Sequence, residues 1–141
     1  MKFFSLFWIL LFCIFCWLPS STHAQQSTKG PLIVGKYKIS AMLQKQKMRK
    51  KPLENSFIEF KKAEDFRAFV GCNQIGGHWT LKKRQLTIHD LVHTEMYCEQ
   101  FMPDEDLLLQ LLSKVNTWKW VSGKLILCQG KKALITLIQD E

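Results

Sequence analysis

The chain has 141 residues, of which 47% are hydrophobic and 23% are charged, and its 20 Lys and Arg against 12 Asp and Glu give a formal net charge of +8. Such a balance favours solubility and attraction to anionic surfaces, and it carries no information about the fold. The length corresponds to one domain, which can bury a core without a structural metal.

The N-terminus has the three parts of a secretory signal peptide. Lys2 supplies a positive charge, residues 3–18 form an uncharged apolar run, and Thr22-His23-Ala24 places small residues at the −3 and −1 positions of a cleavage site. We therefore expect cleavage after residue 24, a single mature domain over residues 25–141, and a periplasmic or secreted location.

Two alternatives to cleavage stay open. A retained membrane anchor is one, although the apolar run is shorter than the ~20 residues that span a bilayer. A lipoprotein is the other, because Cys13 and Cys16 lie in the run. Phe12 and Phe15 precede these cysteines, however, where a lipid-modified cysteine needs small residues.

The mature domain would keep three cysteines, Cys72, Cys98 and Cys128. An oxidising compartment favours one disulfide among them, and the residues alone leave all three pairings open. None of these cysteines forms a CxxC motif, which excludes zinc-ribbon and thioredoxin-like chemistry.

The first predicted strand covers residues 33–43, where Tyr37, Ile39, Ala41 and Leu43 alternate with polar residues. The basic segment 45–51 (KQKMRKK), closed by Pro52, is predicted to be a solvated loop. It is also the candidate contact for an anionic lipid surface, where each basic residue contributes about 1 kcal/mol. The residues concerned are Lys45, Lys47, Arg49, Lys50 and Lys51.

Short strands and one helix fill the rest of the chain. Strands are predicted around residues 57–60 and 66–70, a glycine-rich turn over 71–77, and strands 79–81 and 86–88 around a turn at 82–85. Pro103 and the acidic residues after it begin a leucine-rich helix over residues 103–115. A three-strand meander follows over 117–121, 125–128 and 133–138. We predict a mainly β (α+β) fold, an antiparallel rolled sheet or small β-barrel with one packed helix.

Several short motifs in this order resemble the META domain family, which includes the heat-shock protein HslJ. The chain contains GCN, then Gly-His-Trp, then Thr-Glu-Met-Tyr-Cys, and then a glutamate that opens the helix. The resemblance covers about residues 33–138. The matching residues are Gly71, Cys72, Asn73, Gly77, Trp79, Thr94, Met96, Cys98 and Glu105.

The resemblance implies a compact β-barrel-like fold and a link to envelope stress and drug tolerance, with no established catalytic residues. It also favours a Cys72–Cys98 disulfide. That bond would close a loop of about 27 residues and stabilise the fold by about 3–4 kcal/mol. Cys128, on an alternating strand, is then expected to be a buried thiol; three reduced cysteines are the alternative.

Three arrangements could carry other chemistry. The Asn73 amide could stabilise an oxyanion, although a turn residue that bonds its own backbone is the simpler interpretation. His89 and His93 could form a zinc pair with Glu95 or Cys98, although Asp follows the first histidine where the zinc-protease motif has Glu, and the segment has a strand pattern. We expect surface histidines, no catalytic residues, no metal and no cofactor.

A nucleic-acid surface is the third arrangement. Trp118 and Trp120 face the same way on a strand and could act with the basic segment, but export would separate the protein from nucleic acid. We therefore expect a monomeric, non-enzymatic envelope protein, HslJ-like, that acts in envelope stress or stability by binding an envelope component, whether an anionic lipid or an envelope protein. A lipid- or peptide-binding periplasmic chaperone of the pilotin type is the alternative.

Overall fold

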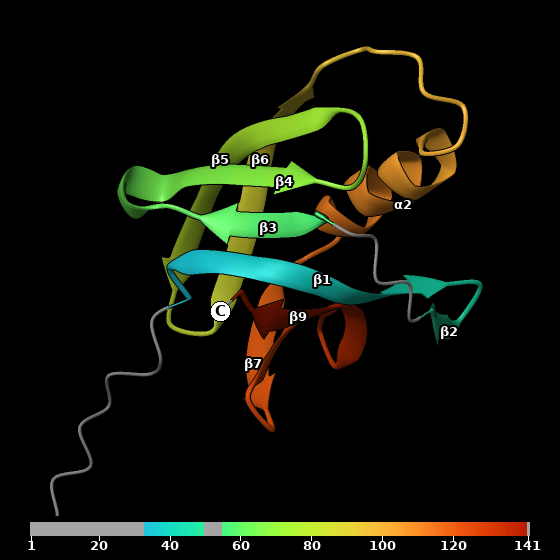
Figure 1. Cartoon of the computed structure of the whole chain (residues 1–141). Helices are drawn as coiled ribbons and strands as arrows, with labels where there is room; N and C mark the ends of the chain where they lie inside the picture. Colours follow the sequence, from blue (N-terminus) through green and yellow to red (C-terminus); the bar gives the residue numbers. More distant parts are fainter. Residues whose placement is uncertain (1–32, 50–54, 141) are drawn as a thin grey trace, which may run out of the picture. The chain divides into compact units, whose positions relative to one another are not determined.

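The computed structural model describes residues 33–49 and 55–140 (Figure 1), and the signal-peptide prediction lies outside them. Residues 32–141 form one compact unit. Within the described residues no helix is both long enough and apolar enough to cross a membrane. The elements are β1 (Gly35–Gln44), β2 (Lys47–Arg49), β3 (Phe57–Phe60), the 3-10 turn η1 (Lys62–Glu64), β4 (Asp65–Phe69), β5 (Gln74–Lys82), β6 (Gln85–His93), α2 (Met102–Leu112), β7 (Thr117–Val121), β8 (Lys124–Gln129) and β9 (Lys132–Gln139).

The strands form one antiparallel sheet that closes on itself. Its order is β2-β1-β3-β4-β5-β6-β7-β8-β9, and β9 also pairs with β1. The seam between β6 and β7 is weak, because the two strands pair only at Gln85 and Thr117. The sheet is therefore a ring-like roll rather than a complete barrel, and the predicted fold class is confirmed.

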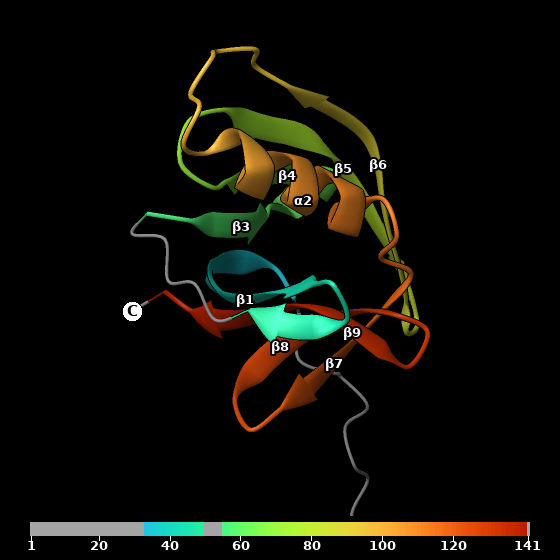
Figure 2. The ribbon, with the colours of Figure 1, turned by 90° about the vertical axis from the view of Figure 1, so that its right-hand side faces the viewer.

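The interior of the roll is filled by apolar side chains. Phe60 packs edge-to-face against Phe66 and Trp79, with ring centroids 5.6 and 5.4 Å apart. Leu108 and Leu112 bring α2 into the same core. Both ribbon views place α2 at the end of the roll where β4 ends and β5 begins (Figures 1 and 2). The helix therefore covers an end of the roll that the sheet leaves open.

The predicted strands are mostly found where the alternating pattern placed them. Strands β7, β8 and β9 match the predicted meander closely. In β1 the alternation holds up to Ala41, but a register shift between Ile39 and Ala41 then turns Met42 into the core, where Leu43 was expected. A one-residue irregularity of this kind exchanges the two faces of a strand.

Two boundaries differ from the prediction. The turn predicted over residues 71–77 is shorter, because β5 begins at Gln74 and both Gly76 and Gly77 pair with neighbouring strands. The helix ends at Leu112 rather than 115, where two hydrogen bonds of the tighter i to i−3 type follow. Val115 is nevertheless buried, which explains why it fitted the apolar pattern of the helix.

The basic segment is not a loop in its described part. Lys45 and Gln46, with φ of 45° and 66°, form a two-residue turn that leads directly into β2. Positive φ at both positions is what the tight turn of a β-hairpin requires. The sequence signal was weak because neither residue is Gly, Asn or Asp.

Candidate functional site

Asn73 is the centre of a buried polar cluster beyond the end of β4. Its Oδ1 accepts hydrogen bonds from Thr94 Oγ1 and Met96 N, both at 2.8 Å. Its Nδ2 donates to Met96 O and Glu105 Oε2, both at 2.9 Å. A carboxamide has two donor hydrogens and two acceptor lone pairs, so its capacity is fully used.

This bonding corrects the sequence-based interpretation of Asn73. The residue was expected to bond the backbone of its own turn, but its partners lie 21 to 32 residues further along the chain. It joins the turn between β4 and β5 to the segment after β6 and to the helix. No donor of the amide is left over for an oxyanion.

Glu105 completes the cluster from the first turn of α2. Its Oε1 accepts hydrogen bonds from the backbone N–H groups of Cys72, at 3.0 Å, and of Asn73. The side chain is buried, and the carboxylate is stabilised by three N–H donors and by the positive end of the helix dipole. Glu105 therefore fixes the start of α2 against the β4–β5 turn.

A disulfide secures the same connection. Cys72 and Cys98 are bonded, with Cα atoms 6.2 Å apart, as the resemblance led us to expect. Thr94 adds a continuation of the sheet, since Thr94 N donates to Gln74 O and Gln74 N donates to Thr94 Oγ1, both at 3.1 Å. The segment from Thr94 to Cys98 is thus attached at both ends, to β5 through Thr94 and to the β4–β5 turn through the disulfide.

The glycines of the motif allow close approach. Gly71 has a φ of 139°, and a Cβ there would lie 2.3 Å from Cδ1 of Phe101. Gly77 lies at a bulge between β5 and β6, and a Cβ there would lie 2.9 Å from the backbone oxygen of His89. Both positions therefore require glycine for packing.

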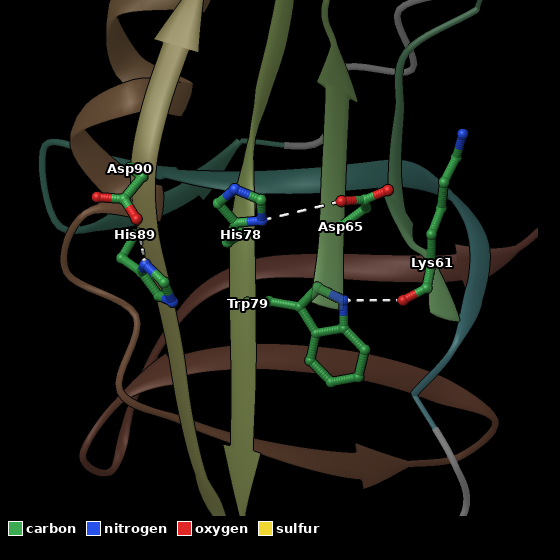
Figure 3. A network of polar contacts seen from close by, with 6 residues as sticks. All are labelled: Lys61, Asp65, His78, Trp79, His89 and Asp90. Carbon is green, nitrogen blue, oxygen red and sulfur yellow. Dashed lines mark hydrogen bonds and ion pairs between the residues drawn. The ribbon is translucent and has the colours of Figure 1, made fainter. Parts of the chain in front are cut away.

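Trp79, on β5, packs against Phe60 in the core of the roll. Its ring is buried, and its Nε1 donates a hydrogen bond to Lys61 O at 3.1 Å (Figure 3). This contact ties β5 to the connection between β3 and η1. With Trp79, the motif residues described so far all have a structural role.

An open groove lies between the disulfide-bonded segment and α2. Its volume is about 270 Å³, and its lining includes Ile75, Leu109 and the motif residues Asn73 and Glu105. Met96, Tyr97 and Met102 surround it and are 57%, 78% and 39% exposed. The sequence assigned Met96 only to the motif and gave no sign of this groove, which is formed by segments distant in the chain.

The histidines do not form the predicted alternative of a metal pair. His89 Nδ1 lies 2.8 Å from Asp90 Oδ2, and His93 Nδ1 lies 3.0 Å from Thr94 O. Over residues 33–49 and 55–140, no group of three or more His, Cys, Asp or Glu side chains could hold a metal ion. Both residues lie on β6, where a spacing of four residues separates them by about 13 Å along the strand instead of one helical turn.

A different histidine pair was missed by the sequence analysis. His78 on β5 lies directly opposite His89 on β6, with ring centroids 6.0 Å apart, and His78 Nδ1 lies 3.8 Å from Asp65 Oδ1 (Figure 3). The two-residue turn at Lys83 and Arg84 sets this register. A four-residue turn over 82–85 was predicted, and the register could not be read from it.

The predicted anionic contact is only partly described. Lys45, Lys47 and Arg49 are exposed on the β1–β2 hairpin, where the Arg49 side chain also donates to Gln44 Oε1. Lys50 and Lys51 lie outside the described residues. The hairpin is therefore an exposed basic element, separate from the groove residues.

Cys128 is a free, buried thiol on β8, as expected. Burial raises its pKa, and the nearby charge of Lys119 partly opposes the increase. Trp118 and Trp120 are half-buried on β7, and Trp120 packs edge-to-face on Tyr37 at 6.2 Å. Both tryptophans pack against the core.

Comparisons with known proteins agree with this arrangement. A solution structure of a protein from Burkholderia xenovorans is 19% identical, with a TM-score of 0.62 over 75% of this chain and 81% of that one. A crystal structure of a DUF4847 family protein from Bacteroides vulgatus is 17% identical, with a TM-score of 0.51 over 75% and 92%. These likenesses concern the fold, and no curated protein matched. The family model of the META domain matches residues 31–141, so the chain belongs to the META domain family.

Proposed function

We propose that this META domain protein is a non-enzymatic binding protein of the cell envelope, exported by its signal peptide, and that it holds its ligand in the groove beside α2. The observation that carries the proposal is the way in which the segment Thr94–Cys98 is held. A disulfide, the Asn73 amide and the pairing with β5 fix its backbone, while Met96 and Tyr97 point their apolar surface outward.

Exposed apolar side chains on a fixed backbone are typical of a binding surface. Covering a large exposed apolar side chain with a partner is favourable, because it removes apolar surface from water. Contiguous exposed apolar patches therefore mark interaction sites. Met96, Tyr97 and Met102 are three of the six large hydrophobic side chains that are exposed among the described residues. Their gathering around one groove supports a binding role.

The polar groups of the motif support binding rather than catalysis. A general base or an oxyanion donor needs a free lone pair or N–H aimed at a substrate. The Asn73 amide is saturated, and Glu105 accepts three hydrogen bonds from the chain itself. The disulfide is compatible with an oxidising compartment, which supports export.

A lipid- or peptide-binding chaperone of the pilotin type is the second candidate. Such a chaperone needs an apolar groove for its ligand, and the groove at Met102 and Leu109 lies beside the helix. The interior of the roll is filled, so a ligand would sit on this end of the domain and not inside it. The chemical class of the ligand distinguishes the two candidates.

Backbone amide NMR spectra of the mature protein would test the proposal. The probes are lysophospholipid micelles, peptidoglycan fragments and a set of short peptides. We expect at least one class to shift the amide signals of Thr94, Met96 and Tyr97, and expect Met102→Ser to weaken that response.

Met48→Ser is the matched control, because Met48 is also an exposed methionine but lies on β2. It should leave the response unchanged. Shifts confined to the β1–β2 hairpin, or no shifts with any probe, would contradict the groove as the binding site.

A further inference from the structure

The groove beside α2 has a charge opposite to that of the chain as a whole. Lys and Arg outnumber Asp and Glu by 20 to 12 in the sequence, but the groove is lined by three carboxylates and by no Lys or Arg. The Glu105 carboxylate accepts hydrogen bonds from the backbone and the side chain of Asn73. Glu95, on the segment after β6, and Asp106, on α2, remain exposed on the two walls.

This inference rests on the groove being the binding site of the proposed function. We infer that the groove binds a cationic peptide segment. One large apolar side chain of the peptide enters between Met96 and Met102, and flanking Lys or Arg side chains pair with Glu95 and Asp106.

The size of the groove favours a side chain over a whole small molecule. Its volume of about 270 Å³ lies just below the range of about 300–1,000 Å³ that is usual for small-molecule sites. A single apolar side chain needs less room than a drug-sized ligand or an acyl chain with its headgroup. An anchor residue of a longer peptide therefore fits the dimensions.

The wall residues suit an anchor of variable shape. Methionine is unbranched and polarisable, and it adapts to different partners; tyrosine supplies a large contact area at a small entropic cost. Met96, Met102 and Tyr97 provide this surface on the rim, and the buried Ile75 lies beneath them. Peptide side chains of several shapes could enter.

The charges then select the sign of the partner. Carboxylates at a rim attract cations and repel anionic headgroups, and complementary charge contributes more to selectivity and association rate than to affinity. A phospholipid or lipopolysaccharide phosphate would meet Glu95 and Asp106 at close range. The geometry therefore favours a basic peptide over an acidic lipid at this site.

Fluorescence polarisation with labelled hexapeptides would test the inference on the mature, oxidised protein. The probe is KKLFKK; EELFEE reverses its charge, and KKSSKK removes its apolar centre. We expect binding of KKLFKK only, with affinity decreasing as salt is raised, because exposed ion pairs are screened.

The double variant Glu95→Gln/Asp106→Asn removes both charges with little change in shape. It should weaken KKLFKK binding about fivefold, since exposed ion pairs are individually modest. Glu64→Gln, an exposed acidic residue on η1, is the matched control and should leave the affinity unchanged. Met102→Ser should weaken binding at every salt concentration.

The outcomes separate this inference from the proposed function. If EELFEE binds as well as KKLFKK and Met102→Ser weakens both, the groove is a binding site but its charge selection is refuted. The same conclusion follows if the double variant behaves like the wild type. If the NMR test finds no probe that shifts the groove signals, and the hexapeptides do not bind, the groove itself is refuted as the site.

Discussion

Replacing Asn73 by alanine tests whether the buried polar cluster stabilises this domain. The substitution removes a carboxamide that joins three parts of the chain, through its bonds to Thr94, Met96 and Glu105. It also leaves Glu105 Oε2 without its donor in a buried position. The backbone of Cys72 and the disulfide are left in place.

The size of the effect follows from the four bonds. The bond to the Glu105 carboxylate is charge-assisted and buried, and its loss costs about 2–3 kcal/mol. The other three bonds are to Thr94 and Met96, which are exposed, so water replaces part of each and the cost is about 0.5 kcal/mol per bond. We therefore expect the free energy of unfolding to decrease by about 4 kcal/mol.

Urea unfolding of the oxidised mature protein, followed by tryptophan fluorescence, measures this difference. Gln110→Ala is the control, because it truncates an exposed carboxamide on α2 and should change stability by less than about 0.5 kcal/mol. Thr94→Ala removes only part of the cluster, should cost about 1 kcal/mol, and serves if the alanine variant at 73 does not fold. A loss below about 1 kcal/mol for Asn73→Ala would refute the cluster as a source of stability.

Four further outcomes are expected. Gly71→Ala should destabilise the protein by about 3 kcal/mol in the same urea assay, because the new Cβ would overlap the Phe101 ring at a strained φ; a neutral result would contradict this packing. Because burial raises the pKa of the Cys128 thiol, its contribution to stability is complete below the ordinary thiol pKa of 9.0 and is lost as the pH rises through the pKa of the folded state. Cys128→Ala should therefore reduce the decrease in unfolding free energy at alkaline pH. An unchanged decrease would contradict a role of the Cys128 thiol. Intact mass of protein recovered from the envelope should correspond to a chain that begins at Gln25, and a mass that includes residues 1–24 or a lipid would show the export prediction to be wrong. Sedimentation with anionic vesicles should be weak and sensitive to salt, and glutamine substitutions at Lys45, Lys47 and Arg49 on the hairpin should reduce it. Equal binding to neutral vesicles would exclude a charge contact.

The candidate site could be predicted from the sequence only in part. The motif order identified Asn73, Glu105 and the Cys72–Cys98 pair as members of one set, and the structure brings them together. It did not say what they do, because a hydrogen bond between residues 32 positions apart has no local signature. The groove was missed for the same reason, since Ile75, Met96 and Leu109 come from three separate segments.

Local sequence patterns were enough to predict the elements and most of their buried faces. Alternation of apolar residues placed β3, β4 and the β7–β9 meander, and leucines at helical spacing placed α2, because side-chain direction follows the period of each element. The order of the motifs indicated the resemblance to the META domain family, which the family model then matched. These features depend on residues close to one another in the chain.

Features that depend on strand register and on closure of the sheet could be seen only in the folded structure. The bulge that turns Met42 inward, the His78–His89 pair and the return of β9 to β1 each result from how one strand meets another. The backbone hydrogen bonds between two strands can form in more than one register. The register is therefore selected by burial of the apolar face in the core and by the geometry of the turns. The groove beside α2 exists because the Asn73 cluster and the disulfide hold a segment that no local preference would place there.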